Sequence, residues 1–118
     1  MAVTSLKLLV LRTTEVQRLL RFYQALGIEF REERHGDGPL HHAGRIGDAV
    51  LELYPLSQEG GQADSTVRLG FAVTDLAATL FSLEAAGETV INRTQQTEWG
   101  WRAVVRDPDG RAVELYQG

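Results

Sequence analysis

The sequence predicts an α+β fold in which a βαβββ unit occurs twice within one domain. The stretch Leu9–Gly27 aligns with Leu69–Gly87 at a constant offset of 60 residues, and both read as an apolar strand followed by a helix. Near the end of each half, Leu-Glu-Leu-Tyr at 51–54 is matched by Val-Glu-Leu-Tyr at 113–116. A chain of 118 residues has the size of one ordinary domain, so we expect residues 1–118 to form a single domain built from two similar modules.

The first module is expected at about residues 5–56. It begins with an apolar, β-prone run, Leu6–Thr13, which predicts a buried strand. Thr14 and Gln17 have the spacing of a helix capping box, and Gly27 stands where a residue with positive φ ends a helix. The apolar face of this helix consists of Val16, Leu19, Leu20, Tyr23 and Leu26. Three further strands are predicted at Ile28–Glu33, Leu40–Ile46 and Ala49–Tyr54.

A polar, glycine-containing linker is predicted at about residues 57–65, and the second module at about 66–118. A strand at Val67–Val73 precedes a helix that has Thr74 or Asp75 as its N-cap and ends at Gly87. Its apolar face consists of Leu76, Leu80 and Leu83. Three more strands are predicted at Glu88–Asn92, Trp101–Arg106 and Arg111–Tyr116, with a turn at Asp107-Pro108-Asp109-Gly110.

The composition excludes several classes of protein. Twelve basic and sixteen acidic side chains give a net charge of −4, and the basic ones form no stripe, so we expect no nucleic-acid partner. The absence of cysteine excludes disulfides, thiol nucleophiles and thiolate metal sites. We find neither a signal-peptide core nor an apolar run of about 18 residues, so we expect a cytoplasmic protein with no membrane association.

Several motifs together resemble the vicinal oxygen chelate superfamily, which contains glyoxalase I, bleomycin-resistance proteins, fosfomycin-resistance transferases and extradiol dioxygenases. They are Phe22-Tyr23-x-x-Leu26-Gly27, and Arg106-Asp107-Pro108-Asp109-Gly110 followed by Val113-Glu114-Leu115, within paired βαβββ modules. The resemblance covers essentially the whole chain. It implies a curled mixed sheet around a cavity with the helices outside, and a homodimer that shares cavities across its interface. The fold alone does not select an activity, because it hosts unrelated chemistries.

The resemblance also implies where a metal would bind. Metal-dependent members take up to four ligands from the first and last strand of each module, usually a His or Gln and a Glu from each. The corresponding positions here are Leu8, Glu52, Arg68 and Glu114. Leucine has no lone pair and a guanidinium repels a cation, so we expect no metal cofactor and hypothesise that Arg68 takes the place of the metal between the two carboxylates. In a competing interpretation all three side chains are simply solvated. If a divalent metal ion is present, Glu52 and Glu114 are its expected ligands.

Further candidates for ligand binding are His41, Tyr54, Trp99, Trp101 and Tyr116. His41 and His42 are neighbours on a predicted strand and therefore point to opposite faces, so they cannot chelate one ion together. The sequence does not decide which of them enters the cavity. The two tyrosines lie two residues after Glu52 and Glu114, on the same side of their strands. The tryptophans suit the wall of a cavity for a planar or apolar ligand.

The leading functional prediction is a protein of the glyoxalase/bleomycin-resistance type that binds an organic small molecule and lacks the usual metal site. The alternative is a metal-dependent lyase, isomerase or dioxygenase with Glu52, Glu114 and His41 as a rearranged ligand set. A third possibility is a structural dimer without a ligand cavity. The sequence identifies neither the ligand nor an enzymatic reaction.

Overall fold

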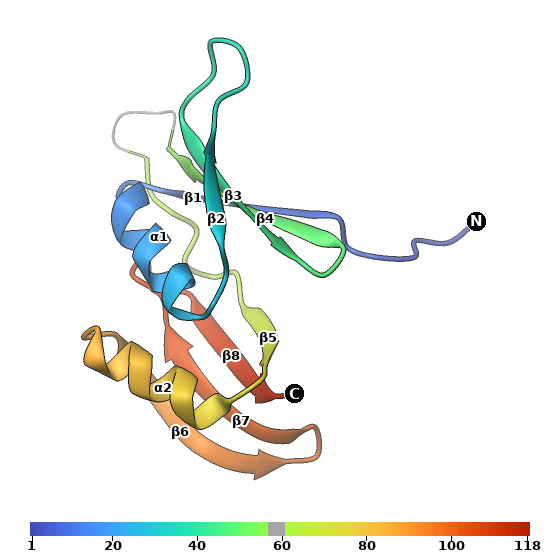
Figure 1. The fold of residues 1–118 in the computed structure, drawn as a ribbon, viewed down its shortest axis with the longest axis vertical. Helices are drawn as coiled ribbons and strands as arrows, with labels where there is room; N and C mark the ends of the chain where they lie inside the picture. The colour runs from blue at the N-terminus through green and yellow to red at the C-terminus, as the bar shows by residue number, and fades with distance from the viewer. Residues whose placement is uncertain (57–60) are drawn as a thin grey trace. The chain divides into compact units, whose positions relative to one another are not determined.

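The computed structural model describes residues 1–56 and 61–118. The chain divides into two compact units, residues 1–63 and 64–118, which we call the first and the second module. Each consists of a strand, a helix and three strands, as the repeat predicts (Figure 1). Of the predicted linker at about 57–65, residues 57–60 lie outside the described residues.

The first module contains β1 (Leu8–Thr13), α1 (Val16–Ala25), β2 (Phe30–Glu33), β3 (His41–Ile46) and β4 (Ala49–Pro55). Its mixed sheet has the order β1-β4-β3-β2, in which β1 pairs with β4 in parallel and the other pairs are antiparallel. The apolar side of α1 buries Leu19, Leu20, Phe22 and Tyr23. Leu51 and Leu53 of β4 and Leu11 of β1 complete this core.

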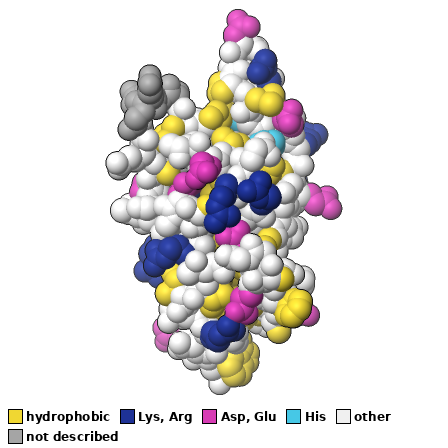
Figure 2. Space-filling model, turned by 90° about the vertical axis from the view of Figure 1, so that its left-hand side faces the viewer, with side chains coloured by type: hydrophobic (Ala, Val, Ile, Leu, Met, Phe, Trp, Pro, Cys, Tyr) yellow, Lys and Arg dark blue, Asp and Glu magenta, His cyan; other side chains and the backbone are white. Residues whose placement is uncertain are grey.

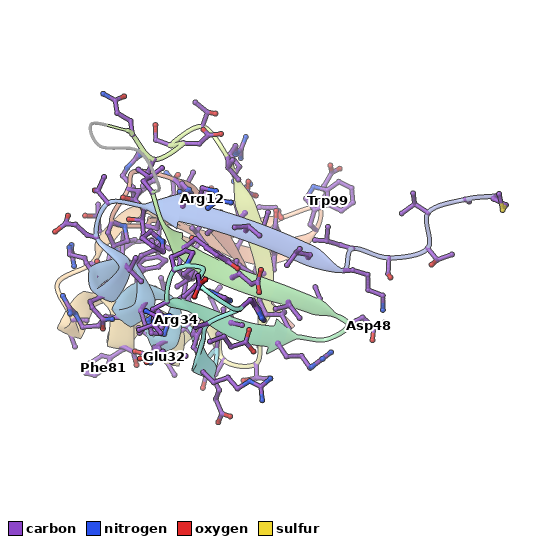
Figure 3. All side chains as sticks on the ribbon, turned by 90° about the horizontal axis from the view of Figure 1, so that it is seen from above. Arg12, Glu32, Arg34, Asp48, Phe81 and Trp99 are labelled. Carbon is purple, nitrogen blue, oxygen red and sulfur yellow. The ribbon has the colours of Figure 1, made fainter. Side chains whose placement is uncertain are left out.

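The second module contains β5 (Leu69–Val73), α2 (Leu76–Ala85), β6 (Thr89–Thr97), β7 (Gly100–Arg106) and β8 (Ala112–Gln117). Its sheet repeats the first one, in the order β5-β8-β7-β6 with β5 parallel to β8. The three predicted leucines of α2 are buried, whereas Phe81 points away from the module (Figure 3). Neither helix of the described chain has the length and apolar character needed to span a membrane.

Two local predictions were wrong. Strand β6 runs five residues beyond the predicted end at Asn92. The sequence did not indicate this extension, because the second half of the strand is polar and exposed, has register shifts, and so lacks an alternating apolar pattern. The capping box of α1 does not form. The helix begins only at Val16, so Thr14 lies outside the N-cap position, and the side chain of Gln17 donates instead to His42 Nε2 at 3.4 Å.

The corresponding cap of α2 is confirmed. Asp75 is its N-cap, and its Oδ1 accepts a hydrogen bond from the N–H of Ala78 at 3.0 Å. Both predicted helix ends are confirmed as well, since Gly27 and Gly87 have φ angles of 94° and 82°, in the left-handed region that favours glycine.

Each sheet has one face covered by its helix and one that we call the helix-free face. In β4, Leu51 and Leu53 point toward α1, so Glu52 and Tyr54 lie on the helix-free face. In β8, Val113 and Leu115 are fully buried, which places Glu114 and Tyr116 on the helix-free face of the second module. The repeat therefore puts the two predicted carboxylates at equivalent positions of two similar sheets.

Candidate functional site

The helix-free face of the first module carries a cavity of about 670 Å³. The predicted residues Leu8 and Glu52 both line it. The complete lining is Lys7, Leu8, Glu29, Arg31, Glu33, Ala43, Gly44, Arg45, Val50 and Glu52. Three cations and three carboxylates thus surround a floor of small and aliphatic side chains. Such a volume lies in the range that holds small organic ligands, and the charges can orient a polar one.

His41 lies on this face and is almost completely buried, with 1% of its surface exposed. Its ring stacks on Tyr54, with centroids 4.1 Å apart and planes inclined by 10°. Nδ1 lies 3.2 Å from the carbonyl oxygen of Pro39, and because a carbonyl only accepts, Nδ1 carries the proton. Nε2 lies 3.5 Å from Glu33 Oε1 and 3.7 Å from Glu52 Oε2.

His42 lies on the opposite face of the same strand. It pairs with Leu53 of β4 and hydrogen-bonds the Gln17 side chain of α1, so it belongs to the helix-covered side. The structure thus decides between the two adjacent histidines, and His41 is the one beside Glu52. All three histidines of the chain belong to the first module, where the histidine atoms visible in Figure 2 lie among acidic, basic and hydrophobic side chains.

Two members of this site were missed by the sequence analysis. Glu33 pairs with His41 across β2 and β3, and His35 follows two residues later, with its Nε2 at 3.6 Å from Glu33 Oε1. One ligand atom from each of Glu33, His35, His41 and Glu52 lies within 4.8 Å of every other. The available signal was the Glu-x-His spacing at the end of a strand that pairs with the His41 strand.

The environment of Tyr54 reflects this concentration of acidic groups. Burial raises the pKa of the Tyr54 hydroxyl, and the negative charges of Glu52 and Glu33 raise it further. The Arg12 guanidinium, 5.2 Å from the centre of the Tyr54 ring, acts in the opposite direction. Tyr54 is therefore held neutral, with its hydroxyl 3.3 Å from His41 Nε2.

Glu114 is the centre of a hydrogen-bonded group on the helix-free face of the second module. The Tyr116 hydroxyl donates to its Oε1 at 2.7 Å, Arg102 donates to the same oxygen at 3.2 Å, and Arg68 donates to Oε2. These donors, led by Tyr116, hold the pKa of Glu114 below its ordinary value of 4.5. Arg68 pairs with Glu114, one of the two carboxylates between which it was predicted to lie, and the other, Glu52, lies beside His41 of its own module. Arg102 was not predicted.

Two of the predicted aromatic residues share a second, smaller cavity. Trp99 and Tyr116 line a space of about 420 Å³ together with Gly70, Phe71 and Ala72. Trp99 stands at the turn between β6 and β7 and is 73% exposed (Figure 3). Trp101 is not part of this lining. It alternates with Arg102 along β7 and therefore lies on the other face of the sheet.

Comparison with known proteins assigns the chain to the superfamily that its motifs resemble. A model of the Glyoxalase/Bleomycin resistance protein/Dioxygenase superfamily matches residues 5–115. No curated protein sequence matches the chain significantly.

Solved structures of the same fold cover nearly the whole chain. TnmS3, an antibiotic binding protein from Streptomyces sp. CB03234, has a TM-score of 0.78 and 22% identity, covering 99% of this chain and 98% of its own. An integron cassette protein from V. cholerae has a TM-score of 0.72 and 25% identity, covering 98% and 95%. A lactoylglutathione lyase from Agrobacterium tumefaciens has a TM-score of 0.69 and 18% identity, covering 98% and 94%.

Proposed function

Because the chain belongs to the glyoxalase/bleomycin resistance protein/dioxygenase superfamily, we propose that it binds an organic small molecule and lacks the superfamily's usual metal site. The observation that carries this proposal is the cavity of about 670 Å³ on the helix-free face of the first module, with its mixture of charged and aliphatic side chains. The antibiotic-binding activity named for one structural neighbour is of the same kind.

The residues at the superfamily's ligand positions do not fit a metal. Leu8 lines the cavity without offering a lone pair, and Arg68 brings a permanent positive charge that is already engaged with Glu114. Of the two remaining carboxylates, Glu114 accepts hydrogen bonds from three donors of its own module, and Glu52 lies beside His41 in the first module. We therefore assign Glu114 and Arg68 to the recognition of a polar ligand and derive no reaction step at these positions.

The test is a thermal-shift screen with bleomycin and a panel of aromatic antibiotics in a buffer that contains a chelator. A compound present at 100 times its dissociation constant stabilises the folded state by about 2.7 kcal/mol. The variant Ala43→Trp fills the cavity without changing any charge, so the shift should disappear. Asp48→Ala, at the tip of the turn between β3 and β4 (Figure 3), is the matched control and should keep it.

A screen without any hit, or an Ala43→Trp variant that still responds, would contradict binding in this cavity. Arg68 belongs to the second module and does not line this cavity, so Arg68→Ala tests a separate point: a lost shift for an anionic compound would support its role in recognition, and an unchanged shift would exclude it. The same measurements distinguish the proposal from a purely structural role, because in that case no compound would stabilise the natural protein or the Ala43→Trp variant.

The second candidate is a metal-dependent lyase, isomerase or dioxygenase with Glu52, Glu114 and His41 as ligands. The position of His41 beside Glu52 favours it. Activity with the hemithioacetal of methylglyoxal and glutathione that requires added metal would support this candidate. The leading proposal expects none, with or without metal.

We further propose a cytoplasmic homodimer, by analogy with superfamily members of this length. Small-angle scattering or gel filtration tests the dimer, and a monomer at micromolar concentration would contradict a cavity shared between subunits.

A further inference from the structure

We propose that Glu33, His35, His41 and Glu52 bind a divalent transition-metal ion of the Zn²⁺ type, entirely within the first module. This set shares only Glu52 with the ligand positions of the superfamily, and it uses neither Arg68 nor Glu114. The inference goes beyond the proposed function, because such an ion can bind whether or not an organic ligand does.

Three of the six separations between the four ligand atoms are close to those of a tetrahedral site, and all six are within 4.8 Å. Metal–ligand bonds of about 2.0–2.1 Å to nitrogen and carboxylate oxygen correspond to ligand–ligand separations of about 3.3–3.5 Å around a tetrahedral zinc ion. His41 Nε2 lies 3.5 Å from Glu33 Oε1 and 3.7 Å from Glu52 Oε2, and His35 Nε2 lies 3.6 Å from Glu33 Oε1. All of these separations exceed the 2.7–2.9 Å or so of a charge-assisted hydrogen bond.

His41 is prepared for coordination. In the neutral imidazole, the bond from Nδ1 to the Pro39 carbonyl oxygen places the proton on Nδ1 and leaves Nε2 to bind a metal, which is the usual arrangement behind a metal-binding histidine. Burial and the stacked Tyr54 ring fix the orientation of the imidazole. Nε2 faces the carboxylates of Glu33 and Glu52, so a divalent cation among the three groups would interact favourably with each of them.

The carboxylates are oriented in a similar way. Arg31 Nη2 donates to Glu33 Oε2 at 3.2 Å, which leaves Oε1 facing the two histidines. Glu33 and Glu52 are both largely buried, with 23% and 15% of their side chains exposed. Two carboxylates and two neutral imidazoles carry the charge that a divalent ion neutralises, and this donor set suits zinc and its neighbours better than calcium or magnesium.

His35 closes the site from the surface. It follows β2, it is 71% exposed, and its ring centroid is 5.0 Å from that of His41. Four protein ligands fill a tetrahedral shell, as in structural zinc sites. We therefore expect the ion to fasten the loop after β2 onto β3 and β4, beside the cavity.

The experiment is a calorimetric titration of the chelator-stripped full-length protein with ZnCl₂, together with the visible spectrum after addition of CoCl₂. We expect one equivalent of Zn²⁺ and the intense d–d bands of tetrahedral cobalt. The variants His35→Ala and Glu33→Gln should weaken Zn²⁺ binding by at least about tenfold, the lower end of what even outer-shell changes cost. Tyr54→Phe should bind at least as well as the natural protein, because the Tyr54 hydroxyl at 3.3 Å competes for Nε2.

His41→Gln and His42→Gln form a matched pair, since the two histidines are adjacent, buried and on opposite faces. Only His41→Gln should lose the ion. If His41→Gln does not fold, His35→Ala carries the test, because that side chain is exposed. Glu114→Gln should leave Zn²⁺ binding unchanged. If Glu114→Gln instead lost Zn²⁺ binding while His35→Ala kept it, the metal would bind at the superfamily's ligand positions and the proposal would be wrong. The absence of Zn²⁺ binding up to millimolar concentration would overturn the proposal while leaving the antibiotic screen, run with chelator, unaffected.

Discussion

Arg111 is the largest fully buried side chain of the chain's described part, and replacing it should destabilise the second module strongly. Its Nη1 donates to Asp107 Oδ2 at 3.0 Å and to Asp109 Oδ2 at 3.1 Å, and its Nε donates to the Asp64 carbonyl at 2.9 Å. The side chains of Arg111 and Asp107 are 1% and 0% exposed. Arg111→Met keeps most of the unbranched stem but leaves the Asp107 charge buried without its guanidinium.

Removing one partner of a buried ion pair costs about 3–5 kcal/mol. With a urea m-value of about 1–3 kcal/mol per M, the midpoint of urea unfolding should fall by roughly 2 M. Arg106→Met is the matched control, because Arg106 is the last residue of β7 beside the same turn, is exposed, and donates to the Gly110 carbonyl. Its loss should cost less than about 1 kcal/mol, the range of exposed ionic contacts.

A second variant separates the charge effect from packing. Adding Asp107→Asn to Arg111→Met removes the buried charge, and the amide oxygen can still accept the hydrogen bonds from the N–H groups of Asp109 and Arg111. The double variant should therefore be more stable than Arg111→Met alone. A double variant that is no more stable, or a midpoint for Arg111→Met equal to that of Arg106→Met, would refute the reasoning.

Three further predictions concern the helix caps and the titrating groups. Asp75→Ala should cost about 1 kcal/mol in urea unfolding through the lost N-cap bond, whereas Glu15→Ala should change stability by less than about 0.5 kcal/mol because the Glu15 side chain makes no cap bond. Because the pKa of Glu114 is lowered in the folded state, its ionised form stabilises the protein at pH values above the ordinary pKa of 4.5, and this stability is lost as the pH falls through the lowered pKa. Glu114→Gln should therefore flatten the decrease of the unfolding free energy in acid. An unchanged pH profile of the unfolding free energy would contradict this. Glu52→Gln should lower the raised pKa of Tyr54 without restoring its ordinary value, because burial is a larger cause of the shift than the charge of Glu52. Absorbance titration at the phenolate band measures the pKa of Tyr54, and a pKa that is higher in the variant would contradict the prediction.

Most of the fold is predictable from the sequence because the two modules repeat the same apolar pattern. Leu51 and Leu53 identify the buried side of β4, which places Glu52 on the opposite face. The end of β6 was not predictable in this way, because the polar residues after Asn92 bury nothing and leave no periodic signal. The failed cap at Thr14 has a different reason. A threonine followed by glutamine three residues later fits the motif, but the position at which β1 passes into α1 is set by sheet pairing.

The choice between His41 and His42 was within reach of the sequence. Gly47 and Asp48 form a two-residue turn, so Ile46 pairs with Ala49, and continuing the register places His42 opposite Leu53. The same register puts His41 on the face of Glu52. Because the register was not continued in this way, the sequence analysis did not identify the group that His41 forms with Glu33 and His35, whose members come from two strands and a loop.

Arg111 was missed for a more general reason. A charged residue beside a turn is normally expected to be solvated, and nothing in its immediate sequence indicates burial. Only the folded module shows that the acids of the turn, Asp107 and Asp109, and the backbone of Asp64 together satisfy its guanidinium.

The proposed function is tested most directly by mapping where a ligand binds. The panel compound with the largest thermal shift is titrated into ¹⁵N-labelled protein, and amide chemical shifts are followed by NMR in buffer with chelator. We predict saturable changes for the residues that line the cavity of the first module, among them Ala43, Arg45 and Val50, and none on the exposed side of α1. Changes confined to α1, or none at saturating compound, would contradict the account.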